Sequence, residues 1–328
     1  MKKIYLIYLF TALLLISCDD EVILSVDSNV ICFDNTFVEQ SQTRASDLTT
    51  NNLLNFYVHG WMTTAQGETT NIFNKEEVVK NSDGSWVYGG GNRYWFNDMS
   101  YEFLAFAPYN ASYTLANDYQ SLTFVNDGNY DFIFAANSRT IEGKVPTSVE
   151  PVRLSFSHIL SKVVLKFENK FSAGDVTLHI DNISLSGLAN QATFNLVDTT
   201  WTITDATLVL NPTFYDSVKN RTECDTSIVV GASATTEQFY IIPEIITGTD
   251  YELQFTVSAW QGPEDGQIKI GKYIHTVNLD AMTFERGKQY CLSAKITSAN
   301  VNPEAALEPI TFTISVTPWG EDIQNEIF

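Results

Sequence analysis

The sequence predicts an all-β fold made of antiparallel β-sandwiches. Apolar residues alternate with polar ones at a period of two in many short segments, which is the pattern of half-buried strands. These segments are rich in Val, Ile, Thr, Tyr and Phe, and only 74–80 offers a short helical pattern between them. Short strands without long intervening helices favour antiparallel sandwiches over a parallel α/β sheet.

The individual strands are predicted from alternation, and their ends from turn-forming residues. Alternation is clearest at 103–106, 163–167, 176–180 and 253–257. Clusters of Gly, Asn, Asp, Ser and Pro separate the strands at 81–84, 89–91, 127–129 and 261–263. The acidic turn at 126–129 lacks the regular oxygen spacing of a calcium loop, so we interpret it as a plain turn.

The length indicates two domains after an N-terminal extension. The 328 residues exceed the roughly 100–200 that one hydrophobic core usually serves. Hydrophobic residues make up 44% of the chain and charged residues 18%, which is typical of packed globular domains. We expect a tether with one short strand (Val30–Phe33) at 18–50, an N-terminal sandwich at 51–157 and a C-terminal sandwich at 158–328. The junction is expected where the strand at 152–156 ends and the strand at 162–167 begins.

The N-terminus has the features of an export signal. Lys2 and Lys3 precede an apolar run, 4–16, that is shorter than the roughly 20 residues a membrane-spanning helix needs. The run ends in Leu15-Ile16-Ser17-Cys18, which resembles the lipobox of bacterial lipoproteins. The resemblance implies that the signal peptide 1–17 is removed and that Cys18 is acylated. The acyl chains would anchor the protein in a membrane, and we expect no other cofactor.

Charge and cysteine content exclude several partners and sites. A net charge of −20 argues against binding to nucleic acid, which needs clustered Lys and Arg. The cysteines after Cys18 are Cys32, Cys224 and Cys291, with no CxxC pair and no histidine at metal-ligand spacing, so we expect no metal site. Two alternatives stay open for Cys291, which are a disulfide with Cys224 and a lone, part-buried thiol.

The sequence carries no recognised enzyme signature. It has no GxSxG elbow, no HExxH pair and no Gly-rich phosphate loop after a strand. The histidines are scattered singly, which favours structural hydrogen-bonding roles; they are His59, His158, His179 and His275. We therefore predict a protein that is not an enzyme and has no catalytic residues.

Aromatic residues flank a triple glycine and raise a second possibility. Trp86-Val87-Tyr88 and Tyr94-Trp95-Phe96 lie on either side of 89–91. Such rings can stack on sugars, but they are also common core residues of β-sandwiches, and we favour packing. The alternative function is therefore that of a monomeric surface lipoprotein that binds glycan or host protein.

Several short phrases resemble the fimbrillin superfamily, the type V pilins of Bacteroides-type bacteria. They occur in the family's order over nearly the whole mature chain; they are Thr43-Arg44-Ala45, Tyr94-Trp95, Tyr101 to Tyr109, Phe156 to Val163 and Pro318-Trp319. The resemblance implies two tandem transthyretin-like β-sandwiches. It also implies an outer-membrane, surface-exposed lipoprotein that is part of a fimbrium, with other pilin subunits as partners.

The resemblance further implies proteolytic activation. A trypsin-like protease would cut between Arg44 and Ala45, in a polar stretch where nothing demands burial. Removing the tether strand would expose a groove that a strand from another subunit fills through main-chain hydrogen bonds. The alternative is that Arg44 is an ordinary linker residue, because some family members keep their N-terminus and serve as anchors.

One segment near the C-terminus has the pattern of a donor strand. Every even position from 310 to 316 is large and apolar (Ile310, Phe312, Ile314, Val316), and every odd position from 311 to 317 is Thr or Ser. One face could therefore fill successive pockets while the other stays polar. The alternative is a permanent strand of its own C-terminal domain. The predicted function is that of a structural pilus subunit, acting at the stalk, tip or anchor.

Overall fold

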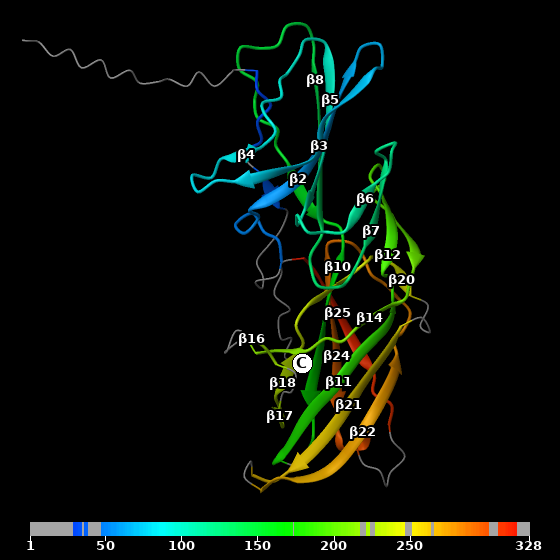
Figure 1. The fold of residues 1–328 in the computed structure, drawn as a ribbon. Coiled ribbons are helices and arrows are strands. Elements are labelled where there is room, and N and C mark those ends of the chain that lie inside the picture. Colours follow the sequence, from blue (N-terminus) through cyan, green and yellow to red (C-terminus); the bar gives the residue numbers. More distant parts are fainter. Residues whose placement is uncertain are drawn as a thin grey trace, which may run out of the picture.

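The fold is all-β, as predicted. The computed structural model describes residues 29–34, 36–38, 47–172, 174–216, 221–223, 227–246, 251–263, 266–301 and 308–319. Figure 1 shows an elongated molecule in which the N-terminal strands form one end and the C-terminal strands the other. The described helical structure is a short 3₁₀ turn, Ser298–Asn300. No helix within the described ranges has the length and hydrophobicity needed to cross a bilayer.

The N-terminal end is built around a seven-stranded sheet. Its order is β1 (Phe37–Val38), β9 (Ser155–His158), β8 (Ile133–Ile141), β5 (Met99–Ala107), β2 (Asn55–Thr64), β3 (Thr69–Lys80) and β4 (Trp86–Tyr88). Strand β1 pairs with β9 in parallel, and the other neighbours are antiparallel. The predicted helical pattern at 74–80 is wrong, because these residues complete β3, which pairs with β2 on one side and β4 on the other.

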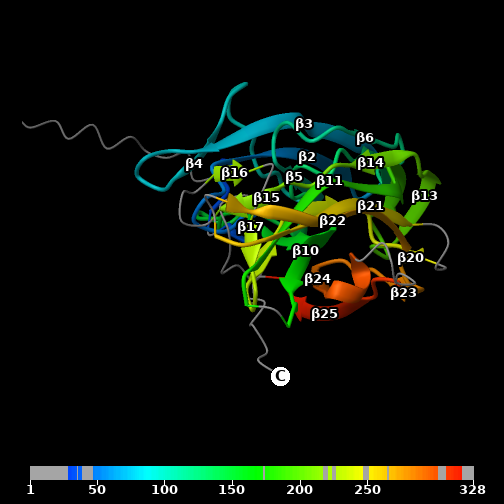
Figure 2. The same ribbon diagram turned by 90° about the horizontal axis from the view of Figure 1, so that it is seen from below.

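Two further sheets face each other at the C-terminal end (Figure 2). One consists of β18 (Ser233–Thr235), β10 (Ser161–Asn169), β24 (Lys288–Ile296) and β25 (Phe312–Pro318), with β19 (Phe239–Ile241) also on β10. The other consists of β14 (Leu208–Leu210), β11 (Val176–Leu188), β21 (Glu252–Gln261) and β22 (Ile268–Asn278), with β17 (Ser227–Val229) also on β11. The predicted antiparallel pattern has a second exception here, since β10 and β24 run parallel.

A four-stranded sheet lies beside the junction of the two ends. Its order is β13 (Trp201–Asp205), β12 (Gln191–Asn195), β7 (Ser121–Val125) and β6 (Tyr113–Leu115). The remaining strands form two-stranded pairs, which are β15 (Phe214–Asp216) with β16 (Arg221–Glu223) and β20 (Ile245–Ile246) with β23 (Met282–Thr283). The four-stranded sheet joins strands from both sides of the predicted 157/158 boundary. The division into two domains therefore stays a prediction.

Three groups of buried side chains stabilise these layers. Inward-facing residues of the C-terminal sheets form one core, with Phe167, Leu178 and Phe255 among them. A second core lies under the N-terminal sheet, and a third fills the junction, where Phe106 and Phe124 meet Tyr240 and Trp319. The alternation seen in the sequence produces this burial. In β5, for example, Tyr101, Phe103 and Ala105 are buried while Glu102 is exposed.

Candidate assembly site

The segment at 29–38 lies between two neighbours and is hydrogen-bonded to both. On one side, the Ile31 amide donates to the Arg93 carbonyl (2.8 Å) and the Trp95 amide to that of Asn29 (2.8 Å). On the other side, the Val152 amide donates to the Cys32 carbonyl (2.7 Å), and β1 continues this parallel ladder along β9. The predicted strand Val30–Phe33 is thus a pair of β-bridges at Val30 and Phe33 rather than a continuous strand.

Side chains of this segment complete the N-terminal core. Phe33 is only 3% exposed, and four rings surround it edge-on or nearly so, with centroids 5.6–6.0 Å away; they are Phe56, Phe73, Tyr88 and Phe103. Ile31 and Val38 are also buried. The Tyr88 hydroxyl donates to the Ile31 carbonyl (2.7 Å). Without this segment, an apolar groove and two rows of unpaired backbone groups would face water.

The residues predicted for lipidation and cleavage, Cys18, Arg44 and Ala45, lie outside the described residues. The predicted cleavage site falls between the segment at 29–38 and Asp47, where the described chain resumes. Cys224 is also outside it, and the Cys224–Cys291 pairing stays a prediction. Cys291 is buried in β24. Cys32 is half-buried, and burial raises the pKa of its thiol.

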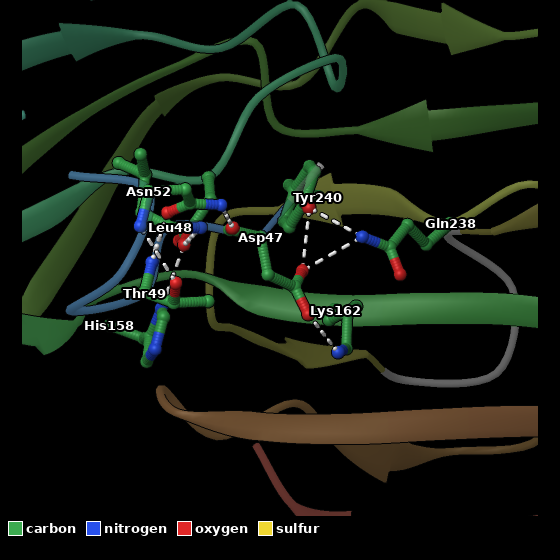
Figure 3. A network of polar contacts seen from close by, with 9 residues as sticks. Asp47, Leu48, Thr49, Asn52, His158, Lys162, Gln238 and Tyr240 are labelled. Carbon is green, nitrogen blue, oxygen red and sulfur yellow. Dashed lines mark hydrogen bonds and ion pairs between the residues drawn. The ribbon is translucent and has the colours of Figure 1, made fainter. Parts of the chain in front are cut away.

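Asp47 is the centre of a buried polar network that is visible in Figure 3. Its carboxylate forms an ion pair with Lys162 (2.7 Å), and both side chains are fully buried. The other carboxylate oxygen accepts hydrogen bonds from the Tyr240 hydroxyl and the Gln238 amide, each at 2.8 Å. The Asp47 carbonyl accepts one from the Asn52 amide (2.7 Å). Buried charges need this degree of pairing, because an unpaired one would be strongly destabilising.

The same network reaches the end of the C-terminal strand. The Lys162 ammonium lies 5.1 Å from the centroid of the Trp319 ring. Trp319 stacks on His158 at 4.3 Å, and His158 is 2.8 Å from the Asp131 carboxylate. The Asp131 oxygen that contacts His158 also accepts the amide of Leu48, the residue after Asp47 (3.1 Å). The start of the described body and the end of β25 therefore meet at one buried cluster.

The predicted donor residues lie at the edge of the C-terminal sheet. Strand β25 pairs antiparallel with β24 of its own chain and has no second neighbour among the described strands. Ile310 is buried, Phe312 and Ile314 pack partly against the C-terminal core, and Val316 is 51% exposed. Burial alternates as predicted from 312 to 315, where Thr313 and Ser315 are exposed, but the pattern reverses at Val316 and Thr317. In this structure the strand therefore completes the edge of a sheet of its own chain.

The aromatic phrases divide between core and surface. Trp86, Tyr88 and Trp95 pack in or against the N-terminal core, as the packing interpretation predicts. Tyr94 and Phe96 are exposed beside them, at 37% and 51%. Another residue that sequence reasoning treated as structural, His59, is buried against Tyr113, and burial followed by the Lys75 charge lowers its pKa to about 4.

Comparison with known families decides what this architecture is. The profile described as fimbrillin-like matches residues 43–319. The chain belongs to the fimbrillin-like family. The matched range of this fimbrillin-like chain includes Asp47, Lys162, Trp319 and all four predicted donor residues. A comparison with curated proteins gives no match.

Solved structures agree with the fold of this fimbrillin-like chain. A fimbrial protein from Bacteroides vulgatus has a TM-score of 0.65 and 19% identity, covering 89% of this chain and 99% of that one. A structure described as a cell adhesion protein from Bacteroides ovatus has a TM-score of 0.50 and 14% identity, covering 89% and 98%. At these identities the likeness concerns the fold alone.

Proposed function

We propose that this chain is exported as a lipid-anchored precursor and that, once cleavage separates it from the anchored N-terminal segment, it assembles by strand exchange as a structural subunit of a surface fimbria. The observation that carries the proposal is the burial of Ile31 and Phe33, upstream of the predicted cleavage site, between backbone neighbours on both sides. Cutting after Arg44 would allow this segment to leave. The empty groove would then accept a strand that supplies the same side chains. A structural role of this kind needs no catalytic residues.

The C-terminal strand carries a matching side-chain pattern. Ile310 and Phe312 have the same spacing as Ile31 and Phe33, with one small residue, Thr311 or Cys32, between the two large apolar ones. In the register we propose, Ile310 of one copy takes the position of Ile31 in the next copy, and Phe312 takes that of Phe33. The exchange trades one set of β-ladder hydrogen bonds for another. Its net gain comes from covering the groove, at about 1.5–3 kcal/mol for each fully buried large apolar side chain.

The first prediction concerns cleavage. Limited trypsin treatment of the folded precursor should cut first after Arg44, and N-terminal sequencing should find a body that begins Ala45-Ser46-Asp47. Lys162 is inaccessible because it is fully buried beneath Trp319. The cleaved body should then form SDS-resistant ladders in the presence of its native partner subunits.

The matched control is Arg44→Gln, which should stay intact and monomeric under the same conditions. Early cuts at Arg153 or Lys162 would contradict a tether followed by a packed body. A ladder formed by uncut Arg44→Gln would contradict cleavage as the trigger.

One observation favours the second candidate, a monomeric surface protein that binds glycan or host protein. The exposed Tyr94 and Phe96 border a cavity of about 520 Å³, with Asn29, Asn97 and Val145 among its other walls. Asn29 belongs to the segment that cleavage would remove. A cleaved wild-type protein that remains monomeric with its partner subunits present would support this second function.

A further inference from the structure

The buried Asp47 network joins the start of the retained chain to the end of the strand that would be exchanged. We propose that it is a latch, in which the Asp47–Lys162 pair holds Trp319 in place and so keeps β25 on its own sheet until assembly. This inference rests on the proposed function, since it concerns the regulation of the same strand. It assigns a role to Asp47, Lys162 and Trp319, which strand exchange alone does not require.

The described contacts of the latch do not involve the segment at 29–38 that cleavage would release. Asp47 lies three residues after the predicted cleavage site, and its side-chain partners Lys162, Gln238 and Tyr240 are all more than 100 residues further along the chain. The side-chain amide of Asn52 donates a hydrogen bond to the Asp47 carbonyl. The contacts that hold Asp47 therefore persist when 29–38 leave, and cleavage alone does not open the latch.

Trp319 depends on this charge pair for its position. Its ring is 1% exposed and lies between Lys162, His158 and Tyr240, with centroids of the last two rings 4.3 Å and 5.7 Å away. An ammonium over an indole face is attracted more strongly when both are shielded from water. Asp47 sets where that ammonium lies. The middle of β25 is held less firmly, because Ile314 is only partly buried and Val316 is half-exposed.

Unpaired polar atoms within the latch favour its opening. Within the described residues, three buried polar atoms of this cluster have no hydrogen-bond partner: Trp319 Nε1, His158 Nε2 and Asp131 Oδ1. Buried polar groups are nearly always paired, and an unpaired group carries a desolvation cost. Release of Trp319 would return its indole N–H to water. The network thus holds β25 while retaining a local penalty that release would relieve.

The test uses the uncleaved full-length precursor and the double variant Asp47→Asn/Lys162→Met. Removing both charges avoids leaving one of them buried alone, so the fold is kept. Hydrogen–deuterium exchange with mass spectrometry should show exchange in a β25 peptide rising by about tenfold or more, while β21 in the opposite sheet keeps its wild-type protection. Lys166→Met, on the same strand as Lys162, is the matched control and should leave β25 unchanged.

Two outcomes would overturn the latch. Wild-type protection of β25 in the folded double variant would mean that the charge pair does not hold the strand. A uniform rise in β25 and β21 would mean that the pair supports the whole body and not β25 specifically. Because the measurement needs neither cleavage nor polymerisation, faster exchange in β25 without ladders after cleavage would keep the latch and reject strand exchange.

Discussion

In cleaved protein, Ile314→Asp is expected to abolish the SDS-resistant ladders, while Thr313→Asp is expected to form them as wild type does. Ile314 is only partly buried on the sheet edge of its own domain, so an aspartate there can turn toward water. If the alternation of Ile310 and Phe312 continues, the side chain at 314 faces into the groove of another copy, where the same carboxylate would be buried without a partner. That costs more than about 3 kcal/mol, which weakens association by over about a hundredfold. Thr313 is exposed and lies on the polar face.

The measurement is gel electrophoresis without boiling, after complete cleavage and with partner subunits present. Circular dichroism of each monomer controls for folding, since Ile314 also touches the C-terminal core. If Ile314→Asp unfolds the monomer, Ile314→Ser is the substitute, because it removes the apolar side chain without adding a charge. Normal ladders from both aspartate variants would mean that the apolar face of β25 does not enter a neighbour.

Phe33→Ala is expected to destabilise the precursor strongly and to leave the cleaved protein unaffected. Phe33 is enclosed by four aromatic rings, and replacing a buried Phe by Ala typically costs about 3–5 kcal/mol. The cost should appear as a lower urea midpoint of the uncleaved chain. After cleavage at Arg44 the residue is gone, and the variant and wild-type bodies have identical sequences.

Phe37→Ala is the matched control, because it removes the same ring from the same segment at a position that is 50% exposed. Its effect on the precursor should be within about 0.5 kcal/mol, as for most surface substitutions. Equal effects of the two substitutions would contradict the view that Phe33 plugs the groove.

Much of the fold could be predicted because its strands are half-buried. The alternation at 103–106, 163–167, 176–180 and 253–257 corresponds to β5, β10, β11 and β21. The parallel pairing of β10 with β24 was not predictable, since it depends on which edges meet and not on local pattern. The short helical pattern at 74–80 failed for the same reason. There, two antiparallel neighbours provide hydrogen bonds that outweigh local propensity.

The candidate site was only partly predictable. The apolar island at 30–33 and the alternation at 310–316 could be seen in the sequence, but the partners of each could not. Asp47 and its network were missed, because a carboxylate and an ammonium 115 positions apart leave no local pattern. One signal was available. Lys162 directly precedes an apolar run at 163–165, and a lysine at such a position is seldom buried unless it is paired.

A disulfide between two copies can test the proposed register of strand exchange. In the precursor, Val30 faces Tyr94 as a non-hydrogen-bonded antiparallel pair, in which Cα atoms lie about 4.5 Å apart. If Ile310 takes the place of Ile31, then Pro309 of the donor copy faces Tyr94 of the acceptor. A disulfide fits that spacing, and Pro309 is exposed and accessible in the monomer.

The experiment mixes a Pro309→Cys donor with a Tyr94→Cys acceptor, both carrying Cys224→Ser and Cys291→Ser, before and after cleavage under mild oxidation. Under the proposed register, we expect a mixed disulfide between copies that forms only after cleavage. We also expect much less of this disulfide when Thr311→Cys replaces Pro309→Cys, because position 311 is two residues out of register with Tyr94. Cleaved copies that polymerise without forming the 94–309 disulfide, or that form it equally well from Thr311→Cys, would contradict the proposed exchange of Ile31–Phe33 for Ile310–Phe312.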